Sequence, residues 1–515
     1  MTATLTKLKT HFVNWREWEL NPVVIKELRQ AVRSWAVTGM LMLFLIVLFV
    51  TSLIFLVNQS FEVSANERLG GDIFQTFTII LAGASILFIP LYVGVRMAAE
   101  RQENNTDLLY ISTLSPMKVI RGKFFCGAYM TLLFFSACMP FMAFTNLLRG
   151  VDLPTVFAIL AFLFVVVCSA NQLAIFIACL PLSRTFKILI GIGGFFMSFW
   201  LIGAVIIGAI GLMRSGIGSM MGERYFWLTT LTIASMISAV GGLLFVLSVA
   251  LISPPSANRA RLPRFYLTTL WLFGGLLAGG WAFQTKEPMI IFSWTYFSTA
   301  LLVASLVVTV SNHDRLSVRV RRTIPARGLK RMLAFSFFNG AAGGLLWVAT
   351  LVVLTFLGTV EYITMSKVHA VASFSGGARG YAPPENLSSF LEVYPPVMIY
   401  IFAYALTALF IQRKFLPRHS PKLAGIFTLL VASVAAFGPS IVLFFLNQLS
   451  WNTLENLQLG NASNLFVVHE SGSRRAHLYF AGGWLLVALV LNGKWFVTQI
   501  KNFRPPPTSV PPPLN

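Results

Sequence analysis

The stretch that decides the fold class is residues 36–57, which read AVTGMLMLFLIVLFVTSLIFLV. It carries no charged residue and is long enough to cross the hydrocarbon core of a bilayer as a helix. Similar stretches recur along the 515 residues, of which 56% are hydrophobic and 11% charged, against about 25% charged in a soluble domain. A water-soluble enzyme cannot bury that much apolar surface. The sequence therefore predicts an all-α polytopic membrane protein.

Twelve membrane-spanning helices are expected, with both termini in the cytoplasm and no soluble domain between them. Their expected positions are 36–57, 73–95, 124–147, 155–180, 188–212, 227–252, 266–284, 289–311, 334–358, 396–411, 423–446 and 478–497.

The charge pattern supports this topology. If the N-terminus is cytoplasmic, 30 of the 39 Lys and Arg residues lie on the inner side, counting Lys494 near the inner end of the last span. Such an excess is typical of the positive-inside rule. The net charge of +21 is therefore interpreted as a topology signal, and a nucleic acid partner is not expected.

The spans carry little that could do chemistry. No Asp, Glu or His lies in the middle of an expected span, and the sequence has no HExxH motif, paired intramembrane aspartates or metal-ligand spacing. Neither catalytic residues nor a metal site are therefore expected. The buried polar residues Asn171 and Gln172 are interpreted as interhelical hydrogen-bonding groups.

Residues 1–35 are expected to be a cytoplasmic amphipathic segment that ends in an interfacial helix. Asn21 is a plausible N-cap and Pro22 fits the first helical position. Apolar residues are expected to line one face and basic residues another, as in a helix that lies in the membrane interface. The apolar set is Val24, Leu28, Val32 and Trp35, and the basic set is Lys26, Arg29 and Arg33.

The cytoplasmic stretch 96–123, between the second and third spans, is too patterned for a plain tether. Thr106 can cap a short helix with Asp107 in its first turn, and Leu108, Leu109 and Leu114 give that helix an apolar side. Ser115 and Pro116 then begin a helix that continues into the third span. An apolar helix presented to the cytosol indicates a partner that covers it.

These two segments resemble type-2 ABC exporter permeases, a likeness that covers about residues 14–250. The stretch 21–29, NPVVIKELR, is similar to that family's opening NP-x-x-x-(K/R)-E-(L/F)-R. The stretch 100–123 is similar to its loop signature E-R-x-x-G-T-(L/D/E)-x-L-L-x-(S/T)-x-(L/P)-S…G-K, except that Asn105 replaces the usual Gly.

The resemblance implies a membrane-spanning subunit that a separate ABC ATPase dimer drives. ATP and Mg²⁺ would bind to that partner, because this sequence has no phosphate-binding loop of its own. It implies coupling contacts to the ATPase from Glu100, Arg101, Thr106, Asp107, Leu108, Leu109, Leu114, Ser115 and Pro116. It implies an elbow helix that depends on Asn21, Pro22, Lys26, Glu27, Leu28, Arg29 and Arg33.

On this interpretation residues 36–253 form the six-span permease domain and residues 254–500 a second six-span region. The second region has outer loops at 359–395 and 447–477, and a disordered Pro-rich tail follows at 501–515. Its inner loop 312–333 is basic and lacks the coupling motif, so it is read as facing anionic lipid. The second region is either a diverged second permease domain or, as slightly favoured, accessory spans in a chain that dimerises or pairs with a second permease.

The expected function is export of an unidentified substrate across a plasma membrane, here the bacterial inner membrane. Low intramembrane charge suits a lipid-linked or amphiphilic cargo better than a small ion. Two other classes stay open: a non-transporting scaffold or assembly factor, and an ion-coupled secondary transporter.

Overall fold

The computed structural model describes residues 22–59, 69–102, 115–147, 151–217, 222–223, 225–285, 287, 289–314, 316–374, 386–446, 458–467 and 471–506. Within these residues the chain is helical and has no strand, and twelve of its helices are long and apolar enough to cross a membrane. The expected all-α polytopic fold is thereby confirmed. Contacts divide the chain into two compact units, residues 1–254 and 255–515.

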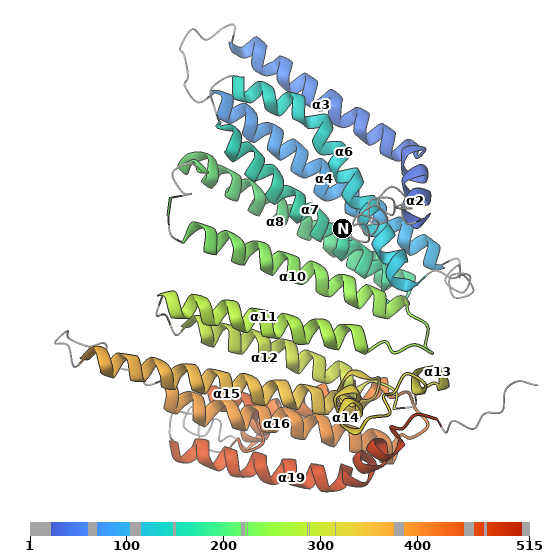
Figure 1. Cartoon of the computed structure of the whole chain (residues 1–515), viewed down its shortest axis with the longest axis vertical. Coiled ribbons are helices and arrows are strands. Elements are labelled where there is room, and N and C mark those ends of the chain that lie inside the picture. Colours follow the sequence, from blue (N-terminus) through green and yellow to red (C-terminus); the bar gives the residue numbers. More distant parts are fainter. Residues whose placement is uncertain are drawn as a thin grey trace, which may run out of the picture. The chain divides into compact units, whose positions relative to one another are not determined.

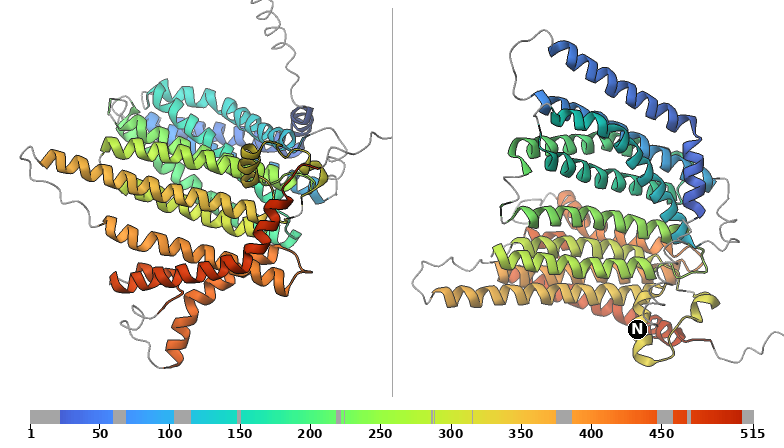
Figure 2. Two further views of the ribbon diagram at one scale, coloured as in Figure 1. Left: turned by 60° about the horizontal axis from the view of Figure 1, so that its bottom comes forward. Right: turned by 45° about the horizontal axis from the view of Figure 1, so that its top comes forward.

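The described residues of the first unit form one short helix and six long ones. The short helix α2 runs across the end of α3, whereas the long helices run roughly side by side (Figures 1 and 2). The core of this unit is formed mainly by α4, α6 and α7, because α4 packs on both of the others. The helices are α2 (Pro22–Val32), α3 (Trp35–Gln59), α4 (Leu69–Gln102), α6 (Pro116–Leu147), α7 (Leu153–Cys179), α8 (Arg184–Ser215) and α10 (Phe226–Ile252).

In the second unit the described residues again form six long helices, together with three short elements. The long helices are α11 (Arg261–Thr285), α12 (Met289–Val310), α15 (Ala341–Phe374), α16 (Asn386–Phe415), α17 (Lys422–Phe445) and α19 (Ser471–Asn502). The short elements are α13 (Val318–Arg321), α14 (Gly328–Phe337) and the 3₁₀ helix η1 (Ala462–Phe466).

The two units share a pattern of helix pairing. In each unit the second long helix packs against the first, third, fourth and fifth. In each unit the fourth long helix also packs against the third, fifth and sixth. In the first unit these two central helices are α4 and α7, and in the second they are α12 and α16.

The ninth span does not begin at residue 334 as expected. Residues 334–337 belong to α14, and α15 starts only at Ala341, after a break in which Gly340 has φ +132°. Because an L side chain rarely adopts such a φ, glycine permits the chain to turn there. Two acceptors fix the start of α15: the Asp314 Oδ1 accepts the Ala341 N–H at 3.0 Å, and Gly340 O accepts the Gly344 N–H at 3.3 Å.

The prediction of an outer loop at 359–395 is also wrong over much of its length, because most of these residues are helical. Helix α15 continues to Phe374, and α16 begins at Asn386 and includes Pro395 and Pro396. Aromatic packing holds the first part of α16 against α15, because Phe356 stacks on Phe390 and Tyr394 at centroid distances of 5.9 and 6.0 Å. Residues 375–385 lie outside the described part of the chain.

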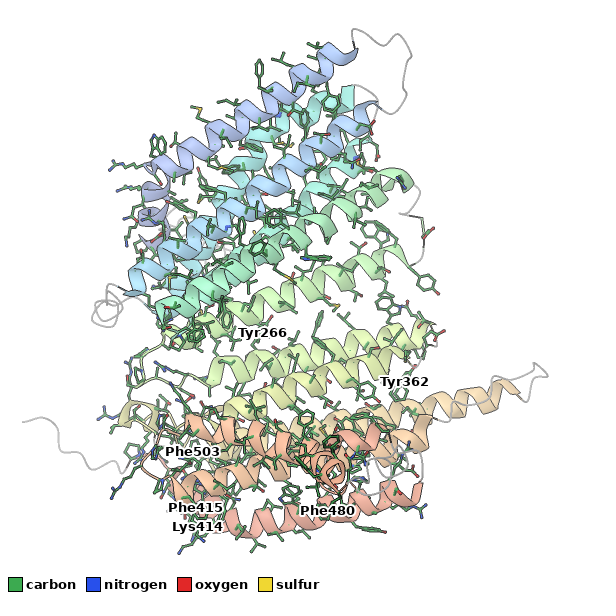
Figure 3. All side chains as sticks on the ribbon, turned by 180° about the vertical axis from the view of Figure 1, so that it is seen from behind. Tyr266, Tyr362, Lys414, Phe415, Phe480 and Phe503 are labelled. Atoms are coloured by element: carbon green, nitrogen blue, oxygen red, sulfur yellow. The ribbon has the colours of Figure 1, made fainter. Side chains whose placement is uncertain are left out.

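The expected outer loop 447–477 also includes regular structure. Its described part contains η1, which is bound by two tyrosine hydroxyls of α16. Tyr404 Oη donates to Gly460 O at 2.5 Å. The amide of Gly460 donates to the Tyr400 hydroxyl, and the amide of Ala462 donates to the Tyr404 hydroxyl. Figure 3 labels Phe480, which packs beside Tyr400 in the same cluster.

Candidate functional site

The expected elbow helix is present as α2, which begins at Pro22 because proline fits the first helical position. Its buried face consists of Val24, Glu27 and Ala31, with Leu28 half-buried against the core. The expected apolar face is therefore wrong in part. Val32 is 63% exposed, and Trp35 belongs to α3 because the chain turns at Arg33 and Ser34. Pro22, Arg29 and Arg33 are exposed, and Asn21 lies outside the described residues.

Four charged residues from three helices converge where α2 meets the spans. The Lys123 Nζ, in the second turn of α6, lies 2.7 Å from Glu27 Oε1 on α2 and 2.8 Å from Glu100 Oε2 on α4. The Lys26 Nζ lies 3.6 Å from Glu100 Oε1. We call these four residues the elbow cluster.

The elbow cluster is neutral overall and graded in burial. Lys123 and Glu27 are 2% and 4% exposed, whereas Glu100 is 32% and Lys26 59% exposed. A buried charge is tolerated only when it is paired and hydrogen-bonded. Lys123 and Glu27 therefore depend on each other, whereas the Lys26–Glu100 pair is largely hydrated and contributes little to stability.

Close backbone approach reinforces the elbow cluster. A Cβ added at Gly122, beside Lys123, would lie 2.6 Å from Val23 Cγ1 on α2. Arg96, one turn before Glu100 on α4, donates to Gln30 Oε1 on α2 and to the Tyr92 hydroxyl at 3.2 Å. Helix α2 is thus attached to both α4 and α6 by contacts that require specific residues.

The cluster lies at the two ends of the expected coupling loop. Residues 96–102 continue α4 and residues 116–123 are the start of α6, so the loop is shorter than the expected 96–123. Ser115 and Pro116 begin the helix that continues into the third span, as expected: the Ser115 carbonyl accepts the Lys118 N–H at 2.9 Å, and Pro116 is the first residue of α6. The coupling residues Thr106, Asp107, Leu108, Leu109 and Leu114 lie outside the described residues.

Arg101 does not join the elbow cluster. It lies beside the thiol of Cys179 at the end of α7, and its Nη1 is buried without a hydrogen-bond partner among the described residues. The structure therefore brings Lys26, Glu27 and Glu100 together and leaves Arg101 apart.

Lys123 was not among the site residues expected from the sequence, because it stands at the expected boundary of a span. The signal that could have identified Lys123 was a basic residue at the start of the third span, combined with an acidic residue at the end of the second span and another in the elbow helix. The interpretation of Asn171 and Gln172 agrees with the structure: Asn171 Nδ2 donates to Phe124 O on α6 at 3.5 Å, and Gln172 Nε2 to Ser248 Oγ on α10 at 3.4 Å.

Two residues of the second unit, Asp314 and Arg264, make contacts at places in the chain that correspond to those of the elbow cluster in the first unit. Asp314, just after the second long helix, binds the N-terminus of the third, as Glu100 binds Lys123 in the first unit. Arg264, in the first turn of the first long helix, donates to the carbonyls of Ser336, Phe338 and Gly340 just before the third. Each unit therefore attaches the entry of its first span to the entry of its third, with different groups.

The elbow cluster joins three helices of the first unit. No group of three or more His, Cys, Asp or Glu side chains that could hold a metal ion occurs among the described residues. No protein-family model, curated protein or solved structure matches the chain.

Proposed function

We propose that this chain is the membrane-spanning permease subunit of an ABC exporter, and that a separate ATPase dimer drives it through residues 103–114. The observation that carries the proposal is the elbow cluster. Glu27, Glu100 and Lys123 are far apart in the sequence and belong to the segments that resemble the family's two motifs. The Lys123 Nζ nevertheless lies within 2.8 Å of a carboxylate oxygen of each glutamate.

The elbow cluster gives a physical route for the coupling. A displacement of residues 103–114 acts directly on the last turn of α4 and the first turn of α6, which flank them. Because Lys123 binds both Glu100 and Glu27, these two helix ends and α2 move together rather than separately. Movement of packed helices as rigid bodies is a common basis of switching between two states. ATP and Mg²⁺ would act in the partner subunit.

We further propose that the second unit is a diverged second permease domain rather than six accessory spans. The shared helix pairing supports this, as do the ties at Asp314 and Arg264 in corresponding places. One chain would then supply both membrane halves of the transporter, and neither a second copy nor a second permease would be required.

The cargo is proposed to be amphiphilic or lipid-linked. A hollow of about 300 Å³ between α3, α4 and α8 is lined almost entirely by apolar side chains, among them Phe44, Leu87 and Phe195. Such a lining suits an acyl chain and offers nothing to an ion.

The test is co-purification from detergent, comparing wild type with the Leu108→Arg, Leu109→Arg variant. Leu182→Arg is the matched control, because Leu182 is an exposed leucine in the next connection on the expected cytoplasmic side. We expect mass spectrometry to find a Walker-motif ATPase with wild type and the control, and to lose it with the double variant.

Three results would contradict the proposal. Absence of an ATPase from every preparation would remove the ABC assignment, and transport that follows an ion gradient without ATP would identify a secondary carrier. An ATPase that binds but is never stimulated by any cargo would identify a scaffold.

A further inference from the structure

The segment between α12 and α15 presents an unusual concentration of positive charge. Residues 315–340 contain seven basic residues and no acidic one. None of the described basic residues among them takes part in an ion pair with another described residue. Those that are exposed are Arg319, Arg321, Arg322, Arg327 and Lys330.

This segment is fixed at the level where the membrane-spanning helices begin. Arg264 is 2% exposed and lies in the first turn of α11, a candidate membrane span. Its guanidinium donates to Ser336 O at 2.8 Å, Phe338 O at 2.7 Å and Gly340 O at 3.1 Å. Asn258 Nδ2 donates to Phe337 O at 3.2 Å. The C-terminal end of α14 is therefore held at the end of a span, which is the depth of the bilayer interface.

The end of α19 holds the segment from a second direction. Phe503 packs edge-on against Phe335 and Phe338, with ring centroids 5.2 Å apart in both pairs. Val320 and Ile324 complete this buried cluster. Figure 3 places Phe503 at the same end of the second unit as Lys414 and Phe415.

Helix α14 has apolar residues on two faces, only one of which is covered. Phe335 faces the buried cluster around Phe503. Leu329, Met332 and Leu333 are spaced as one helical face, and they are 70%, 61% and 60% exposed. An apolar face of this kind beside a field of cations is typical of a helix that lies in a membrane interface.

We propose that the α13–α14 segment binds anionic phospholipid in the leaflet on its side of the membrane. Leu329, Met332 and Leu333 enter the boundary between headgroups and acyl chains, and Arg319, Arg321 and Arg322 bind lipid phosphates. The fixed depth of α14 favours lipid over a soluble acidic partner, because its apolar face stands at the height where headgroups are found. The inference is independent of the proposed ATPase partner.

The first experiment measures the depth of α14. A nitroxide at Met332→Cys is compared with one at Thr323→Cys, an exposed position in the connection between α13 and α14. The four native cysteines compete little for labelling, since three are buried and Cys168 is half-buried. In nanodiscs with and without phosphatidylglycerol, we expect the label at 332 to collide more with oxygen than with an aqueous nickel chelate. We expect this difference to grow with phosphatidylglycerol, and the label at 323 to stay aqueous.

The second experiment tests the cations by counting phosphatidylglycerol molecules that remain bound in native mass spectrometry. The variant is Arg319→Gln, Arg321→Gln, Arg322→Gln. Its matched control is Lys414→Gln, Arg418→Gln, Lys422→Gln, which removes three exposed charges around the α16–α17 connection of the same unit. We expect at least about a tenfold loss of affinity in the variant and a much smaller loss in the control.

Three outcomes would overturn the proposal. A label at 332 that is fully accessible to the nickel chelate in every nanodisc would place α14 in water. Equal losses in the variant and the control would mean that bulk charge alone attracts the lipid. A label at 332 that is shielded from both reagents in native membranes, yet exposed in nanodiscs, would identify a protein partner instead.

Discussion

Replacing Lys123 by Met removes the cation on which the elbow cluster depends. Glu27, which is 4% exposed, then loses its partner at 2.7 Å, whereas Glu100 keeps Lys26. Removing one partner of a buried ion pair costs about 3–5 kcal/mol. Each kcal/mol lowers the Tm of a unit of this size by about 2–4 °C. We therefore expect Lys123→Met to lower the Tm of the first unit by roughly 6–20 °C.

The assay uses the chain's own cysteines. Cys126, Cys138 and Cys179 are buried and Cys168 is half-buried, and all four belong to the first unit. A thiol-reactive dye that fluoresces on coupling therefore reports the unfolding of this unit in detergent as temperature rises.

Two further variants separate the ionic cluster from a general loss of charge. Lys26→Met breaks only a pair in which the lysine is 59% exposed, and should cost about 0–1 kcal/mol. Glu27→Leu combined with Lys123→Met removes both buried charges, and should regain most of the lost stability. A Tm of Lys123→Met equal to that of Lys26→Met would contradict the buried ion pair, and so would a double variant as unstable as Lys123→Met alone.

Three other substitutions test the packing and the polar ties. Gly122→Ala should destabilise the first unit by about 1–3 kcal/mol, because its Cβ would lie 2.6 Å from Val23 Cγ1 and 2.8 Å from Val23 Cβ. Val23→Ala in the same chain removes only the Cγ contact and should therefore relieve part of this cost, both measured by the thiol assay. Arg264→Leu removes the guanidinium that donates to the carbonyls of Ser336, Phe338 and Gly340, so hydrogen exchange of residues 334–341 should become faster, as followed by mass spectrometry. Tyr404→Phe removes the donor to Gly460 O and should cost about 1–3 kcal/mol, measured as a lower Tm by intrinsic tryptophan fluorescence.

Matched controls exist for two of these substitutions. Gly193→Ala in α8 meets no atom within 4 Å and should be neutral or slightly stabilising, because alanine favours a helix. Tyr479→Phe removes the hydroxyl of a side chain that is 76% exposed and should change stability by less than about 0.5 kcal/mol. Equal effects of a substitution and its control would contradict the packing or bonding assigned to Gly122 or Tyr404. Unchanged exchange in Arg264→Leu would contradict the tie at the start of α15.

The fold class and the number of candidate spans could be predicted from the sequence alone. Apolar stretches such as 36–57 carry that information locally, because a chain in hydrocarbon must satisfy its backbone hydrogen bonds within each helix. Local sequence also predicted where α2 and α6 begin, because each starts at a proline, Pro22 and Pro116. The break before α15 could not be predicted from local sequence, because residues 334–337 are apolar enough to continue a span. The break depends on contacts from the distant residues Arg264 and Asp314.

The tertiary structure decided which charged residues act together. Nothing in the local sequence distinguishes Lys123 from Lys118, which is exposed on the same helix. Lys123 becomes a buried cation only because α2 and α4 each bring a carboxylate to it. Likewise the cations of residues 315–340 were visible in the sequence, but their fixed depth depends on Arg264 and Phe503, which are distant along the chain. Burial and pairing depend on long-range packing, which hydropathy and periodicity do not encode.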